Sequence, residues 1–187
     1  HDTCRRQRQM CIRDSMDAFA LASQKRAANA IEKGYFKDQI TPVKITKKRE
    51  EFAFDTDEHV RGETTADGLA SLRPAFDKEG QVTAGNSSGI NDGAAALILG
   101  NAEKVEKSNK SPLAKIISYG FGGVAPRIMG MGPVPASKMA LERAGLKVSQ
   151  IDIVESNEAF AAQACAVSKE LGLPSDIVNP NLSLIHI

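Results

Sequence analysis

Residues 151–172, IDIVESNEAFAAQACAVSKELG, hold the pattern that decides the fold class. Residues 151–154 form a short apolar run, as in a buried strand, and residues 158–171 carry small apolar side chains at helical spacing before Gly172. The polar triplet SNE at residues 156–158 lies at the junction. The stretch therefore predicts a strand that passes directly into a helix.

Strand-like and helical segments alternate through the rest of the chain as well. Helices are predicted over residues 16–33, 102–107 and 135–144. Strands are predicted over residues 40–46, at a sheet edge because of Pro42, and over residues 94–99 and 113–119. The charged residues 47–63 predict a surface loop or a short hairpin. This alternation is typical of α/β layers with parallel strands, and we expect a domain boundary near Pro112.

The composition indicates a globular protein that acts on small molecules or proteins. Of the 187 residues, 42% are hydrophobic, which is enough for a packed core. The formal net charge of +1, with acids and bases interspersed, offers no field that would attract nucleic acid or an anionic membrane. No apolar stretch is long enough to span a bilayer, and no signal-peptide core is seen. We expect a soluble, cytoplasmic protein without nucleic-acid or membrane partners.

The two ends differ from the rest of the sequence. Residues 1–15 hold four of the ten arginines and two of the three cysteines, without helical or strand periodicity, and residues 182–187 form an unpatterned apolar tail. We expect both to be foreign to the natural protein, as translated adapter sequence is; a basic arm and a frayed tail are the alternative. Setting them aside leaves Cys165 and His59 as the remaining cysteine and histidine, which excludes a disulfide framework and a cysteine zinc site.

Asn157 has two interpretations from its position alone. As the residue before a helix it would cap the first free backbone amides. At the end of a strand, beside the positive end of a helix, its amide could instead hold a water or an oxyanion. Both roles are compatible.

The other candidate residues are weaker on their own. The loop TAGNSSG at residues 83–89 offers flexible backbone and hydroxyls near a ligand, although a simple turn explains it equally. Met129 would ordinarily fill a gap in the core, and Cys165 among small apolar residues would be a packed thiol. His59 lies in the charged stretch and is expected to be solvated.

Four longer motifs together resemble the thiolase family. In chain order they are LRPAFDKEGQVTAGNSSGINDGAAALIL at residues 72–99, IMGMGPVPAS at 128–137, ALERAGL at 140–146 and ESNEAFAAQACAV at 155–167. Within the family, the sequences of these motifs are most similar to those of bacterial acetyl-CoA C-acetyltransferases, also called acetoacetyl-CoA thiolases. The resemblance runs from about residue 16 to residue 181.

The resemblance implies part of a thiolase fold, layered α/β/α/β/α. Residues 16–111 would form the end of the N-terminal domain with a segment of its loop domain, and residues 112–181 the start of the C-terminal domain. Because each sheet would lose strands, we expect the isolated chain to aggregate or to fold weakly.

The resemblance also implies a reaction and its residues. A thiolase cysteine takes an acyl group from coenzyme A, and the enolate of a second thioester attacks it to give a 3-ketoacyl-CoA, or the reverse. Asn157 matches the asparagine that holds a water in the oxyanion hole. The positions that match coenzyme A and acyl contacts are Arg61, Ser88, Met129, Ala159 and Phe160. Coenzyme A thioesters would be substrates, and no cofactor or metal would be bound permanently.

Three catalytic groups of the family have no match in this sequence. They are the nucleophilic cysteine, the histidine of a Gly-His-Pro motif and a second cysteine, so we expect the chain alone to be inactive. Two alternatives stay open: a degradative 3-ketoacyl-CoA thiolase, and a thiolase-like protein that binds acyl-CoA or lipid without catalysis. By family, the parent protein would be a homodimer or homotetramer.

Overall fold

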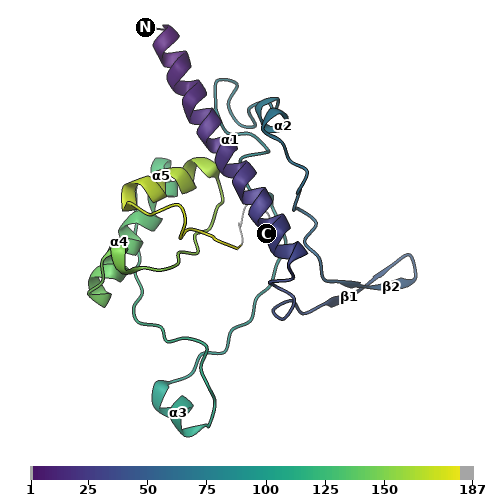
Figure 1. Cartoon of the computed structure of the whole chain (residues 1–187), viewed down its shortest axis with the longest axis vertical. Helices are drawn as coiled ribbons and strands as arrows, with labels where there is room; N and C mark the ends of the chain where they lie inside the picture. The colour runs from purple at the N-terminus through teal and green to yellow at the C-terminus, as the bar shows by residue number, and fades with distance from the viewer. Residues whose placement is uncertain (1, 182–187) are drawn as a thin grey trace. The chain divides into compact units, whose positions relative to one another are not determined.

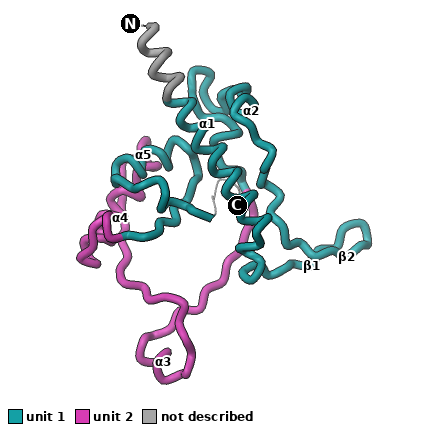
Figure 2. The backbone as a smooth tube through the Cα atoms, in the orientation of Figure 1, with its two compact units in different colours: residues 1–90, 151–187 teal, residues 91–150 magenta. Residues whose placement is uncertain are grey.

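The computed structural model describes the backbone of residues 2–181 and the side chains of residues 12–181. Within it the chain divides into two compact units, residues 1–90 with 151–187 and residues 91–150 (Figure 2). These units are clusters of contacts within the chain. The domain boundary expected near Pro112 stays a prediction.

The first unit is built on helix α1 (Asp2–Glu32), the long helix of Figure 1. The side chains buried on this helix recur at helical spacing, and four of them are alanine or serine: Met16, Asp17, Ala20, Ser23, Gln24, Ala27 and Ala30. The sequence predicted five of these positions. Ile31, which was also predicted to be on this face, is 42% exposed. A face of alanines allows neighbouring backbone to approach closely, because these side chains add little width.

The start of α1 differs from the prediction, which placed it at Met16. The helix already begins at Asp2. An existing helix gains one hydrogen bond for each residue added, and arginine, glutamine and methionine are good helix formers, so no apolar periodicity is needed to extend it. The foreign origin of residues 1–15 stays a prediction, and residues 182–187 lie outside the described residues.

The ends of three helices are confirmed at glycines. Gly34, Gly145 and Gly172 have φ values of 68°, 67° and 67°, a left-handed conformation that glycine adopts without steric cost. After α1, the amide of Tyr35 donates to Ala30 O and that of Gly34 to Ile31 O. These two bonds form a Schellman motif and satisfy carbonyls at the end of the helix.

Helix α5 (Ala161–Leu171) contacts α1, as the short helix α2 (Ala66–Ala70) also does. The buried face of α5 consists of Ala161, Ala164 and Val167. The helix begins three residues later than the sequence predicted. The preceding residues 155–160 form an irregular segment, named here the 155–160 loop.

Strands β1 (Val43–Lys47) and β2 (Glu50–Phe54) form an antiparallel hairpin that extends away from the helices of its unit (Figure 1). Lys48 and Arg49 at its tip both have positive φ, as a two-residue hairpin turn requires. Residues 43–46 of the strand predicted at residues 40–46 are thus confirmed, and residues 47–54 form the hairpin that was one alternative for residues 47–63. The strand predicted at residues 151–154 is reduced to one parallel bridge, between Val154 and Val178.

The second unit contains α3 (Ala102–Lys107), η1 (Pro126–Met131), α4 (Pro133–Ala144) and η2 (Val148–Gln150). The bounds of α3 are those predicted, and α4 begins two residues earlier than predicted. The prediction of strands at residues 94–99 and 113–119 is wrong, because neither segment pairs with a strand within residues 2–181. Their apolar side chains are exposed, among them Leu97, Ile98 and Ile116.

Residues 118–122 pack along α4 instead of forming a sheet. Ser118 Oγ donates to Ala140 O at 2.6 Å, and Arg143 Nη1 donates to Tyr119 O at 2.9 Å. A Cβ atom at Gly122 would lie 2.7 Å from the backbone nitrogen of Ala136, so only glycine permits this approach. In the described part of the chain, no helix is both long and apolar enough to cross a membrane.

Candidate functional site

Two loops that the sequence singled out lie against each other in the first unit. One is residues 83–89, named here the 83–89 loop, and the other is the 155–160 loop. The amide of Ser88 donates to Ala159 O at 2.9 Å, and the amide of Ala161 donates to Asn86 O at 3.0 Å. Ser87 and Phe160 form an antiparallel bridge. Backbone pairing thus brings together three predicted site residues, Ser88, Ala159 and Phe160.

The 83–89 loop is held in shape by Asn86, whose side chain is fully buried. Its Oδ1 accepts from the amide of Thr83 at 2.8 Å, while its Nδ2 donates to Asp17 Oδ1 at 2.9 Å and to Gln81 O at 3.1 Å. An amide side chain has the donors and the acceptor that these bonds require. Asn86 therefore fixes the loop both to itself and to α1.

Asp17 is in turn paired with Arg13. Arg13 Nε lies 2.6 Å from Asp17 Oδ2, four residues along α1, and Arg13 Nη2 donates to Leu69 O at 2.8 Å. A buried carboxylate of this kind is costly unless it is paired and hydrogen-bonded. The Arg13 contact provides such a pair for Asp17.

Glu158 is the largest fully buried side chain of the described residues, at 1% exposed. Its Oε2 accepts from Ser23 Oγ of α1 at 3.0 Å, and its Oε1 accepts from Asn179 Nδ2 at 2.6 Å. Burial raises the pKa of the Glu158 carboxyl above its usual range, whereas these hydrogen bonds and the charge of Arg26 act in the opposite direction. The carboxyl ties the 155–160 loop to α1.

Asn157 does not cap helix α5, so the capping interpretation is wrong. The capping position is held by Phe160, with φ −143° and ψ 135°, and no side chain caps the helix there. The amide of Ala161 is bonded by Asn86 O instead, which is a contact with a distant segment. The side chain of Asn157 is exposed, and among the described residues no hydrogen bond is recorded for its amide. It is therefore available to a water or a ligand.

Phe160 is 39% exposed and contacts Phe76 edge to face, with ring centroids 6.3 Å apart. Phe76 is itself 78% exposed. The two rings present an apolar surface beside Ser88 and Ala159, as contact with an apolar ligand group requires.

Arg61 and Met129 are outside this group of loop residues. The amide of Arg61 donates to Gln24 Oε1 of α1 at 2.7 Å, and its side chain is exposed in the first unit. Met129 belongs to the second unit, where it is in η1 with 78% of its surface exposed, so the prediction that it fills a core gap is wrong. The assignment of both to coenzyme A or acyl contacts stays a prediction.

Four buried polar residues of the site escaped the sequence analysis: Asp17, Asn86, Glu158 and Asn179. Their burial depends on partners far along the chain, such as Asn86 for Asp17 and Ser23 for Glu158. Glu158 and Asn86 did stand inside the quoted motifs. Each is a charged or amide residue within a stretch of small residues, and this contrast was the sequence signal that could have indicated a buried polar contact.

Cys165 is half-buried on α5, as expected of a packed thiol. Burial raises the pKa of its thiol, and the charge of Glu158 acts in the same direction. A thiol with a raised pKa is a poor nucleophile at neutral pH. Among the described side chains of residues 12–181, no group of three or more His, Cys, Asp or Glu could hold a metal ion.

Two family models match the chain. Residues 5–103 match the N-terminal domain of thiolase, and residues 110–186 match the C-terminal domain. Among curated relatives, beta-ketothiolase BktB of Cupriavidus necator is 55% identical over 176 residues, which are 94% of this chain and 45% of that protein. Acetyl-CoA acetyltransferase of Shinella zoogloeoides is 52% identical over 175 residues, again 94% and 45%. The chain thus spans about 45% of the length of these relatives.

Solved structures agree on the fold. The Bacillus anthracis acetyl-CoA acetyltransferase has a TM-score of 0.90 and 49% identity, over 93% of this chain and 44% of that one. Human mitochondrial 3-ketoacyl-CoA thiolase in complex with CoA has a TM-score of 0.87 and 44% identity, over 93% and 43%. The partial thiolase fold expected from the sequence is confirmed.

Proposed function

This chain belongs to the thiolase family, and we propose that it is the middle part of a thiolase that joins two acetyl-CoA molecules into acetoacetyl-CoA and CoA, or catalyses the reverse. The observation that supports this most is the pairing of the 83–89 and 155–160 loops. It places Ser88, Ala159 and Phe160 together, with the exposed amide of Asn157 on the same loop. A polar donor next to an apolar surface is what an acyl thioester requires.

The proposed role of Asn157 is to hold a water in the oxyanion hole. When the second acetyl-CoA loses a proton, negative charge develops on its thioester oxygen, and a donor aimed at that oxygen lowers the barrier. An exposed amide without a capping bond can turn its N–H groups toward a bound water. Because the side chain of Asn157 does not cap α5, its amide can bind the oxyanion-hole water.

The acyl-CoA substrate would be held by the remaining predicted residues. Ser88, Ala159 and Phe160 would contact the pantetheine and acyl part, and Met129 of the second unit would be a further acyl-CoA contact. Arg61 is exposed, and the planar donor group of arginine suits the phosphates of coenzyme A. The solved relative in complex with CoA supports this class of ligand for the family.

We also propose that these 187 residues alone do not catalyse the reaction. The acyl group must be carried by a thiolate, which displaces CoA from the first thioester and is displaced in turn by the enolate carbon. Cys165 does not suit this role, because it is half-buried and its thiol pKa is raised. The nucleophile and its histidine are expected from segments that match no part of this chain. The cytoplasmic location and the homodimer or homotetramer of the parent stay predictions.

A second candidate function is suggested by a solved relative. Human mitochondrial 3-ketoacyl-CoA thiolase has a TM-score of 0.88 and 44% identity to this chain, so a preference for longer 3-ketoacyl-CoA substrates is the second candidate.

The test begins with the complete reading frame at the source locus, read across the junctions near Ser15 and Asn181. Its product, called here the complete protein, is assayed for CoA-dependent cleavage of acetoacetyl-CoA and of a 3-ketoacyl-CoA with a ten-carbon or longer chain. We expect faster cleavage of acetoacetyl-CoA. Faster cleavage of the long chain would support the second candidate, and reversible CoA binding without any cleavage would refute both.

A further inference from the structure

The residues on either side of Asn157 are tied down by one side chain, that of Asn179. Asn179 Oδ1 accepts from the amide of Ser156 at 2.7 Å, and its Nδ2 donates to Ser156 O at 2.8 Å and to Glu158 Oε1 at 2.6 Å. Both amide hydrogens and the carbonyl oxygen of Asn179 thus have partners in the 155–160 loop. Asn179 is 1% exposed, so water does not compete for these bonds.

The position of Asn179 is itself fixed by backbone contacts. Its amide donates to Val154 O at 2.9 Å, and the amide of Val154 donates to Ile177 O at 2.9 Å. Asn179 has φ 46°, in the left-handed region where asparagine is one of the few residues other than glycine that occurs often. An asparagine at this position therefore satisfies both the backbone and the three hydrogen bonds.

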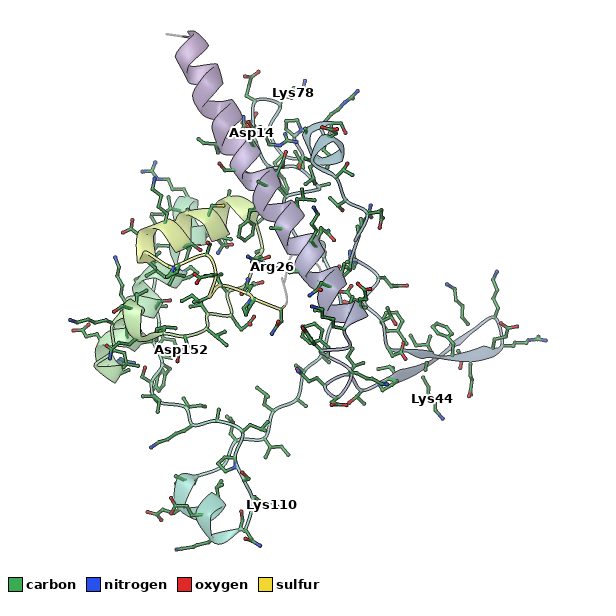
Figure 3. All side chains as sticks on the ribbon, in the orientation of Figure 1. Asp14, Arg26, Lys44, Lys78, Lys110 and Asp152 are labelled. Atoms are coloured by element: carbon green, nitrogen blue, oxygen red, sulfur yellow. The ribbon has the colours of Figure 1, made fainter. Side chains whose placement is uncertain are left out.

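Helix α1 holds the same loop from a second direction. Ser23 Oγ donates to Glu158 Oε2 at 3.0 Å. Arg26, which is labelled in Figure 3, donates from Nη1 to Val178 O, next to Asn179, at 3.1 Å. Ser23 and Arg26 are three residues apart and so lie on one face of the helix. The segments that carry Glu158 and Asn179 are thereby joined to one rigid element.

The burial of residues 155–158 alternates. Glu155 and Asn157 are exposed, Ser156 is half-buried and Glu158 is buried. Because hydrogen bonds hold Ser156 and Glu158 from the inner side, Asn157 between them lies on the exposed side of the loop.

We propose that Asn179 and Glu158 are positioning residues that set the direction of the Asn157 amide. This inference rests on the proposed function, in which that amide holds the oxyanion-hole water. A donor displaced by about 1 Å can cost on the order of a hundredfold in rate, so a loop held at both neighbours of the donor has a direct catalytic consequence. A purely structural network would affect only the amount of folded protein.

The test compares matched variants of the complete protein. Asn179→Gly keeps the left-handed backbone and removes all three side-chain bonds. Asn109→Gly is the control, because Asn109 also has positive φ, at 54°, but is exposed. Glu158→Gln is the conservative variant: its carbonyl can accept from Asn179, and the hydroxyl of Ser23 can rotate to accept from its amide. Ser23→Ala removes the contact from α1 to Glu158 and replaces Asn179→Gly if that variant does not fold.

The readouts are kcat and KM for acetoacetyl-CoA cleavage per folded molecule, and hydrogen–deuterium exchange of the peptide that contains Ser156. For Asn179→Gly or Ser23→Ala we expect kcat to fall about tenfold or more, with KM within twofold, and faster exchange at Ser156. Glu158→Gln and Asn109→Gly should stay within about threefold of the unmodified protein. The proposal is overturned if exchange rises while kcat per folded molecule is unchanged. An unmodified protein without activity would instead remove the proposed function, and this inference with it.

Discussion

Removing the buried carboxyl of Glu158 should destabilise the protein strongly. Glu158→Ala leaves the hydroxyl of Ser23 and the Nδ2 of Asn179 without this acceptor, and each buried unsatisfied donor costs about 1 to 3 kcal/mol. Ser23 can recover part of this loss by donating to a carbonyl one turn back in α1. We therefore expect a decrease of about 3 kcal/mol in the free energy of unfolding.

The assay is urea unfolding of the complete protein at pH 7, followed by circular dichroism. Glu155→Ala is the matched control, because Glu155 is exposed on the same loop, and it should change stability by no more than about 0.5 kcal/mol. Glu158→Gln should lie near the control, because both of its contacts can be satisfied. Equal stability of the Glu158→Ala and Glu155→Ala variants would refute the claim that the carboxyl holds the loop.

Three further results are expected. The pKa of Glu158 is raised in the folded protein, so its contribution to stability is present at low pH and is lost as the pH rises through the raised pKa; the stability of the unmodified protein relative to Glu158→Gln should fall from pH 4.5 upward in urea titrations. Asn86→Asp places a second carboxylate against Asp17 and should cost about 2 to 3 kcal/mol in the same assay at pH 7. Gly122→Ala should lower the melting temperature, at a cost of about 1 to 3 kcal/mol, because its Cβ would overlap α4.

Asn86→Asp and Gly122→Ala each have a matched control. Asn101 caps α3 through its side-chain oxygen alone, so Asn101→Asp keeps the cap and should leave stability unchanged. A Cβ at Gly123 would meet nothing within 4 Å, so Gly123→Ala should melt with the unmodified protein. If Asn86→Asp were as stable as Asn101→Asp, the Asn86 contact with Asp17 would be refuted. If Gly122→Ala melted with Gly123→Ala, the close approach of Gly122 to α4 would be refuted. If the unmodified protein instead became more stable relative to Glu158→Gln as the pH rose, the pKa of Glu158 would be lowered in the folded protein, not raised.

Local signals in the sequence were sufficient for most of the helices and for the hairpin. Gly34 and Gly172 end their helices through bonds that reach only a few residues back, and α3 has its cap and all its residues within one short segment. Such features depend on neighbours in the sequence, so a pattern can predict them.

The start of α5 and the two apolar runs depend on distant partners. Residue 161 begins the helix because Asn86 O binds its amide, which a helix rule for Asn157 could not include. The runs at residues 94–99 and 113–119 have strand-like composition, but a strand requires a neighbour to bond with. The chain spans about 45% of its relatives, and within residues 2–181 these runs have no such neighbour.

The candidate site was predicted in its motifs but not in its support. The loop residues Ser88, Ala159 and Phe160 came from the thiolase resemblance, and the structure brings them together. The burial of Glu158 and Asn86 was missed, because their partners on α1 are 135 and 69 residues away. A polar residue is read as exposed unless a distant partner is known.

The central claim is that Asn157 serves the reaction rather than the fold, and kinetics of the Asn157→Ala variant of the complete protein test it most directly. We expect kcat for acetoacetyl-CoA cleavage to fall about a hundredfold, as for loss of one oxyanion-hole donor, with the free energy of unfolding changed by no more than about 0.5 kcal/mol. Asn29→Ala, at an exposed asparagine of α1, should change neither quantity. A kcat for Asn157→Ala within threefold of the unmodified enzyme, or a rate loss that follows a loss of folded protein, would contradict the account.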